Sequence, residues 1–144
     1  MKHASVTEAH QLQASGATYV DVRSTGEFAA GHPEGAVNVP LLEQDDRGQM
    51  AQNPDFLRVM KAAFPADARL LVGCQAGMRS LKASQMLETF GFTDVTNVRG
   101  GFGGARDPSG ALVEPGWAGS DLPVATGADG AASYDALLDK ADKA

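Results

Sequence analysis

The only cysteine of this 144-residue chain, Cys74, lies between an apolar run and a segment of helical periodicity. Residues 70–72 are apolar, which is typical of a buried parallel strand. Apolar residues recur at helical spacing over residues 80–90, and Gly91 is a fitting helix end. Cys74 is therefore expected at the carboxyl end of a strand, opening a short loop that leads into a helix. Ligands of open α/β sheets bind at this edge.

The loop after Cys74 has the features of an anion-binding site. Successive backbone N–H groups in a tight loop form a ring of donors, and the helix start adds the positive end of its dipole. Gly77 lets the loop curl, and Arg79 adds a permanent positive charge. Such surroundings favour the thiolate, which is the nucleophilic form of cysteine. The alternative is a buried structural cysteine without chemistry, but the strand–loop–helix setting favours a reactive one.

The segment Cys74-Gln75-Ala76-Gly77-Met78-Arg79-Ser80 resembles the active-site loop of the rhodanese family of sulfurtransferases. Residues 21–40 are similar to the amino-terminal signature of that family, and residues 97–102, with Trp117 and residues 122–124, to the carboxyl-terminal one. The resemblance covers residues 5–124 in the right order. It implies that Cys74 is the catalytic nucleophile. The residues that it implies for substrate binding are Gln75, Ala76, Gly77, Met78, Arg79 and Ser80.

Loop length separates the chemistries of the related enzymes. Cys74 to Arg79 spans six residues, the length that the resemblance associates with a sulfur-sized site, whereas related phosphatases and arsenate reductases use a loop one residue longer. The expected activity is of the thiosulfate sulfurtransferase type: sulfane sulfur moves from thiosulfate or a persulfide to cyanide, a thiol or a protein through a Cys74 persulfide. A weak persulfide carrier that acts with a protein partner is the alternative, and an arsenate reductase or phosphatase is a more distant one.

Asp21 and Arg23 end another predicted strand, over residues 18–23, and are expected near the Cys74 loop as supporting residues. Asp21 either accepts hydrogen bonds from the backbone of that loop or forms a charge pair with Arg23 that shapes the turn into residues 24–30. Glu27 and His32 are candidate partners of Arg23 in a structural ion pair. Arg79 either contacts an anionic donor directly or points outward.

Composition limits the classes of partner. The net charge of −6 argues against nucleic acid and against an acidic membrane surface. His3, His10 and His32 lack metal-ligand spacing, so neither a metal nor a cofactor is expected. No apolar run has membrane-spanning length, no signal-peptide pattern opens the chain, and the cytoplasm is the expected compartment. The expected partners are a small anionic sulfur donor and a small thiophile, thiol or protein acceptor, and the chain is expected as a monomer or homodimer.

The elements around the loop predict a three-layer α/β rhodanese-like fold, with a mostly parallel sheet of about five strands and helices on both faces. Residues 1–124 are expected to form the catalytic domain, and residues 125–144 a C-terminal tail with a weak helical pattern. Ser5 and Glu8 have the spacing of a capping box that opens a short helix through Gln13. Gly100 and Gly101 are expected to allow a close backbone turn. Residues 41–53 are expected to be a polar surface loop. Residues 103–123 look like an insertion, in which Trp117 either packs in the core, the favoured interpretation, or covers the site as a lid.

Overall fold

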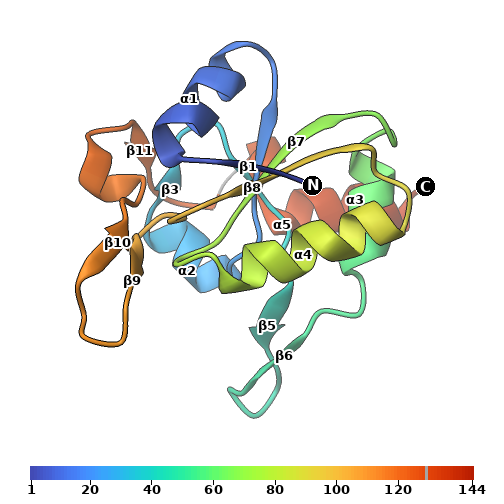
Figure 1. The fold of residues 1–144 in the computed structure, drawn as a ribbon. Coiled ribbons are helices and arrows are strands. Elements are labelled where there is room, and N and C mark those ends of the chain that lie inside the picture. Colours follow the sequence, from blue (N-terminus) through green and yellow to red (C-terminus); the bar gives the residue numbers. More distant parts are fainter. Residues whose placement is uncertain (129) are drawn as a thin grey trace.

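The computed structural model describes residues 1–128 and 130–144, and its centre is a parallel sheet flanked by helices (Figure 1). The strand order is β1-β8-β7-β2-β4, and every neighbouring pair is parallel. The strands are β1 (Lys2–Ala4), β8 (Asp94–Val98), β7 (Arg69–Gly73), β2 (Thr18–Asp21) and β4 (Val37–Asn38). The expected five-stranded, mostly parallel sheet of a three-layer α/β fold is confirmed.

Alternating side chains of the strands feed two hydrophobic cores, one on each face of the sheet. Val20 and Val72 face a core that α3 (Phe56–Ala63), α4 (Met78–Thr89) and α5 (Tyr134–Asp142) complete. Tyr19 and Leu71 face the opposite core, to which α1 (Val6–Ala14) and α2 (Thr25–Ala30) contribute. Trp117 is fully buried in this second core, which confirms the core interpretation over the lid.

Two helices begin with the same capping arrangement. In α1 the Ser5 side chain accepts the backbone N–H of Glu8, and the Glu8 carboxylate accepts the N–H of Ser5, as the sequence predicts. Ser24 and Glu27 repeat this exchange at the start of α2. The second capping box therefore stabilises a short helix directly after the Asp21–Arg23 pair.

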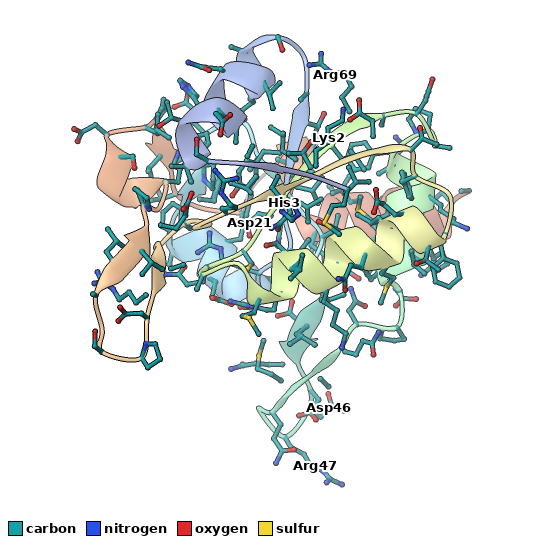
Figure 2. The ribbon with its side chains drawn as sticks, viewed as in Figure 1. Lys2, His3, Asp21, Asp46, Arg47 and Arg69 are labelled. Carbon is teal, nitrogen blue, oxygen red and sulfur yellow. The ribbon has the colours of Figure 1, made fainter. Side chains whose placement is uncertain are left out.

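Two antiparallel hairpins project from the layered body (Figure 1). One pairs β5 (Leu42–Gln44) with β6 (Met50–Gln52), within the segment that was predicted to be a polar surface loop, and carries Asp46 and Arg47 at its tip (Figure 2). The other pairs β9 (Ala105–Arg106) with β10 (Leu112–Glu114) inside the segment expected to be an insertion. These short strands are largely exposed, so they lack the apolar pattern by which strands are predicted.

The last part of the chain returns to the body of the fold. The short strand β11 (Val124–Ala125) pairs with β3 (His32–Pro33), and the 3₁₀ helices η1 (Ala118–Ser120) and η2 (Gly130–Ala132) lie on either side of β11 in the sequence. Helix α5 then packs against α3. Ala141 is buried there, and the Tyr134 hydroxyl accepts a hydrogen bond from Asn53 at 2.9 Å. Residues 134–142 therefore contribute to the same core as the central sheet.

No helix within residues 1–128 and 130–144 is both long enough and apolar enough to cross a membrane.

Candidate active site

Cys74 directly follows β7, a central strand of the sheet, and its side chain is 2% exposed. The backbone N–H of Gly77 donates to Cys74 Sγ at 3.0 Å. Gly77 has a φ of +110° and is the N-cap of α4, so it makes the sharp entry into that helix. The N–H groups of the first turn of α4, residues 78–80, precede the first intrahelical donor. The sulfur therefore lies beside a set of backbone donors at a helix start.

The residues predicted to bind substrate surround this sulfur unequally. Gln75 and Ala76 are exposed at the surface of the loop, and Met78 is 81% exposed. Ser80 is fully buried and accepts a hydrogen bond from the Cys74 thiol at 3.4 Å. The thiol thus lies at the floor of a loop whose outer side chains face solvent.

An ion pair between Asp21 and Arg23 lies under the loop, and its two side chains are almost completely buried. Arg23 Nη2 lies 2.7 Å from Asp21 Oδ2, and the Arg23 backbone N–H also donates to Asp21 Oδ1. Arg23 Nη1 donates to Gln75 Oε1 at 3.2 Å, and its guanidinium carbon lies 4.5 Å from the centre of the Phe102 ring. Asp21 and Arg23 therefore reach the Cys74 loop through the Gln75 side chain, and the Asp21 carboxylate is occupied by Arg23.

A second ion pair lies at the rim of the loop. Arg79 donates from Nη1 to Glu27 Oε1 at 2.6 Å and from Nη2 to Glu27 Oε2 at 3.1 Å. The hydrogen bonds from Arg79 lower the pKa of Glu27 to about 2, and those to Glu27 raise the pKa of Arg79. The expected pairing of Glu27 and His32 with Arg23 was wrong. His32 stacks instead on the Phe28 ring, 3.6 Å between ring centres, because α2 presents Phe28 to it.

The geometry of the fold and loop agrees with the comparison with known proteins. Residues 5–106 match the family model of the rhodanese-like domain. The chain belongs to the rhodanese-like domain family.

Two curated relatives carry sulfurtransferase names. Thiosulfate sulfurtransferase 16 of Arabidopsis thaliana, a chloroplastic protein, is 45% identical over 68% of this chain and 81% of that protein. The human thiosulfate:glutathione sulfurtransferase is 38% identical over 68% of this chain and 87% of its own. Two longer plant relatives are matched over 52% and 53% of their lengths. Among solved structures, Rv0390 from M. tuberculosis aligns with a TM-score of 0.73 and 26% identity, covering 88% of this chain and 98% of that one.

In this rhodanese-like domain a backbone clamp holds the Cys74 loop from the segment that follows β8. Phe102 N–H donates to the Cys74 carbonyl at 2.7 Å, and Gly103 N–H donates to the Gln75 carbonyl at 2.9 Å. Gly101 has a φ of +56°, and a Cβ at this position would collide with the Cys74 carbonyl. Sequence reasoning noted the double glycine as a close turn but did not connect it to the cysteine.

Tyr19 packs against Gly73, the residue that precedes Cys74. Its hydroxyl occupies the space where a side chain of Gly73 would lie, and it has no hydrogen-bond partner among the described residues. Burial raises the pKa of Tyr19 well above its usual value, and the nearby charges of Asp21 and Cys74 act in the same direction. Gly73 therefore allows the aromatic core to pack directly against the strand that carries the cysteine.

A surface cavity of about 440 Å³ opens next to the loop, where both ion pairs border it. It is lined by Arg23, Glu27, Ala30, Gly31, Gln75 and Phe102. Within residues 1–128 and 130–144, no cluster of histidine, cysteine and carboxylate side chains could hold a metal ion. The chemical groups gathered here are thus a thiol, backbone donors and two arginines that are each paired with a carboxylate.

Proposed function

We propose that the protein is a sulfurtransferase that carries sulfane sulfur as a persulfide on Cys74. The observation that carries this proposal is the position of Cys74 Sγ inside the six-residue loop, 3.0 Å from the N–H of Gly77 and at the start of α4. Backbone donors and a helix start stabilise an anionic sulfur. The sulfurtransferase names of the two relatives support the same reaction class.

In the first half of the reaction the Cys74 thiolate attacks the outer sulfur of thiosulfate. The bond between the two sulfurs of thiosulfate breaks, sulfite leaves with that electron pair, and Cys74 keeps one additional sulfur as an anionic persulfide. The N–H groups of residues 75–80 hold the new terminal sulfur as an oxyanion hole holds oxygen. A persulfide donor reacts in the same way, with a thiolate as the leaving group.

In the second half an acceptor removes the terminal sulfur. Cyanide attacks it to give thiocyanate and regenerates the Cys74 thiolate, and a thiol or protein thiolate gives a new persulfide. Atoms and charge balance in both halves without a cofactor. Because the sulfur is buried while Gln75, Ala76 and Met78 are exposed, the acceptor approaches across the outer face of the loop.

Arg79 contributes charge at the rim rather than a free pair of donors. Both of its terminal nitrogens already bind the Glu27 carboxylate. A phosphatase or arsenate reductase needs an arginine fork that grips an oxyanion, so this pairing and the short loop both disfavour that chemistry. Gln75, Ala76, Gly77, Met78 and Ser80 are proposed to shape the sulfur site, with Asp21 and Arg23 as its support.

The carrier alternative differs from the enzyme in its response to a small donor. Thiocyanate formation from thiosulfate and cyanide should saturate with thiosulfate and disappear in Cys74→Ser. A carrier would turn over thiosulfate without saturation and respond mainly to a protein persulfide donor. Hydrolysis of an aryl phosphate that Cys74→Ser abolishes, with no thiocyanate formed, would contradict the proposal.

The partners that we propose follow from the same site and from charge. They are a small anionic sulfur donor and a small thiophile, thiol or protein acceptor, and the net charge of −6 disfavours nucleic acid and acidic membranes. A working free thiol suits a reducing compartment, and we propose the cytoplasm. A monomer or homodimer is the proposed assembly.

A further inference from the structure

The cavity beside the Cys74 loop brings hydrogen-bond donors and a carboxylate together. Its polar lining comes from Arg23, Gln75 and Glu27, and the rest of the lining carries no charge: Ala30, Gly31 and Phe102. Helix α2 lies beside the start of α4, so Glu27 and the loop border the same space (Figure 1). At about 440 Å³ the cavity has the size of a small-molecule site.

Two donors of this cavity have hydrogens without an acceptor in the part of the chain that the structure describes. Nε and Nη2 of Arg23 bind Asp21 and the Gly31 carbonyl. Nη1 gives one hydrogen to Gln75 Oε1, so its second hydrogen is unpaired on a side chain that is 3% exposed.

The same contact leaves the nitrogen of the Gln75 amide unused. Because a guanidinium only donates, the amide presents Oε1 to Arg23, and no described residue accepts a hydrogen bond from Nε2. Gly103 makes room for this group, since a Cβ at that position would collide with Nε2. Unpaired donors on a buried guanidinium and on the amide beside it favour a ligand with an anionic oxygen.

Glu27 contributes the opposite charge to this cavity. Its Oε1 accepts hydrogen bonds from Arg79 and Ser24, whereas Oε2 accepts only from Arg79 among the described residues. A glutamine would complete the same capping box, and a carboxylate at the rim repels an anionic sulfur donor. The capacity of Oε2 to accept another hydrogen bond therefore favours a second ligand group, one with a positive charge.

We propose that this cavity binds the sulfur acceptor and that the acceptor is a thiol with an α-amino acid group. Its carboxylate binds Arg23 Nη1 and Gln75 Nε2, and its ammonium group binds Glu27 Oε2, while Phe102 contacts its carbon atoms. The inference rests on the proposed function and names the class of acceptor within it.

Binding here positions the acceptor for the second half of the reaction, because Gln75 directly follows Cys74. The acceptor thiolate attacks the terminal sulfur of the Cys74 persulfide. The bond between that sulfur and Cys74 Sγ breaks, Cys74 leaves as a thiolate with the electron pair, and the acceptor becomes a persulfide.

The test begins with full-length protein that has been loaded with thiosulfate and freed of small molecules, so that donor binding has no influence. The loaded protein is mixed with cysteine, with cysteamine, which lacks the carboxylate, or with 3-mercaptopropionate, which lacks the ammonium group. Intact mass follows the conversion of the persulfide to unmodified protein at rising thiol concentration. Each variant is compared with wild type for the same thiol, so the intrinsic reactivity of the thiols cancels.

Glu27→Gln should react about three- to tenfold more slowly than wild type with cysteine and cysteamine, the fold-change that one hydrogen bond corresponds to. Its reaction with 3-mercaptopropionate should not slow. Glu43→Gln removes the same charge from a neighbouring cavity and should match wild type with all three thiols. An unchanged cysteine rate in Glu27→Gln, or an equal loss in Glu43→Gln, would overturn the inference.

Gln75→Glu keeps an oxygen for Arg23 but removes the amide hydrogens. It should slow cysteine and 3-mercaptopropionate about three- to tenfold and leave cysteamine unaffected. This pattern should persist in about 1 M salt, which screens charges beyond about 3 Å, and its loss there would overturn the inference. If Gln75→Glu takes up no sulfur, the Glu27→Gln comparison decides alone.

The failure of this inference differs from the failure of the proposed function. Wild type that takes up sulfur and passes it to cyanide, with variants that slow all three thiols equally, would overturn the acceptor class alone. Wild type that never takes up sulfur would overturn the proposed function as well.

Discussion

The two ion pairs beside Cys74 differ in burial, and the difference separates their roles. The inner pair, Asp21–Arg23, is 1% and 3% exposed and is tied to Gln75, whereas the outer pair, Glu27–Arg79, is 34% and 22% exposed at the rim. A buried charge without its partner is strongly unfavourable, but a partly exposed pair is screened by water. The inner pair should therefore fix the position of the loop, and the outer pair should set the charge that a donor meets.

The inner pair should give the largest effect on stability. Arg23→Met leaves the buried Asp21 carboxylate without its partner and should lower the free energy of unfolding by about 3–5 kcal/mol, measured with urea. Arg58→Met removes an exposed arginine that pairs with Asp55 and Asp142 and should leave the urea midpoint nearly unchanged. Equal midpoints for the two variants would contradict the assignment of Arg23 to the framework.

The backbone clamp belongs to the same inner layer, and Gly101→Ala tests it. The added Cβ meets the Cys74 carbonyl and also opposes a positive φ, so we expect a loss of about 2–4 kcal/mol together with lower sulfur transfer. Gly110→Ala is the matched control, because Gly110 has a φ of +86° but open space around it. It should cost about 1–2 kcal/mol and leave activity unchanged. Equal losses of activity in Gly101→Ala and Gly110→Ala would show that the contact of Gly101 with the Cys74 carbonyl does not hold the loop for sulfur transfer.

Changes to the outer pair, Glu27–Arg79, should alter the KM for the anionic sulfur donor. Glu27→Gln keeps a side chain that can complete the capping box of α2 but removes the charge that neutralises Arg79. The KM for thiosulfate should fall about three- to tenfold at low salt with kcat nearly unchanged, and the gain should fade as salt is added. Glu43→Gln is the control, because the Glu43 carboxylate accepts the backbone N–H of Thr25 and not a hydrogen bond from Arg79. This variant should leave the KM for thiosulfate unchanged. A rise in KM for Glu27→Gln would show that Arg79 needs Glu27 to be held in place.

The smallest effect concerns stability at acid pH. The pKa of Glu27 is about 2 in the folded protein, below its ordinary value of 4.5, because Arg79 holds the charged form. Its contribution is therefore complete above pH 4.5 and is lost as the pH falls toward 2. Because the pair is partly exposed, we expect the free energy of unfolding of wild type at pH 7 to exceed that of Glu27→Gln by less than about 1 kcal/mol. Urea unfolding should show this difference shrinking between pH 4.5 and 2, and a difference that persists at pH 2 would contradict it.

The sequence predicted the features that depend on neighbours along the chain. The strand, the loop and the helix around Cys74 are local, and so is the capping box at Ser5. The Glu27–Arg79 pair joins residues 52 positions apart, and its identity depends on how α2 and α4 meet. Nothing local pointed to Arg79 as the partner of Glu27, so Arg23, nearer in sequence, was the mistaken choice.

Other differences have the same physical origin. The hairpins β5–β6 and β9–β10 are exposed, so no apolar alternation marks them in the sequence. The contact of Gly101 with the Cys74 carbonyl is a close approach of two backbones, which glycine permits but does not specify. Asn97 contacts Ser80, at the start of α4, and His3, on the neighbouring strand β1. These contacts depend on how three separate segments meet, so no single segment of the sequence predicts them.

The central claim is that Cys74 carries the transferred sulfur, and intact mass measures this most directly. The reduced protein is incubated with thiosulfate beside Cys74→Ser, and both are then treated with cyanide. The account predicts that wild type alone gains the mass of one sulfur atom and that cyanide removes it. No gain in folded wild type, or the same gain in Cys74→Ser, would contradict the account.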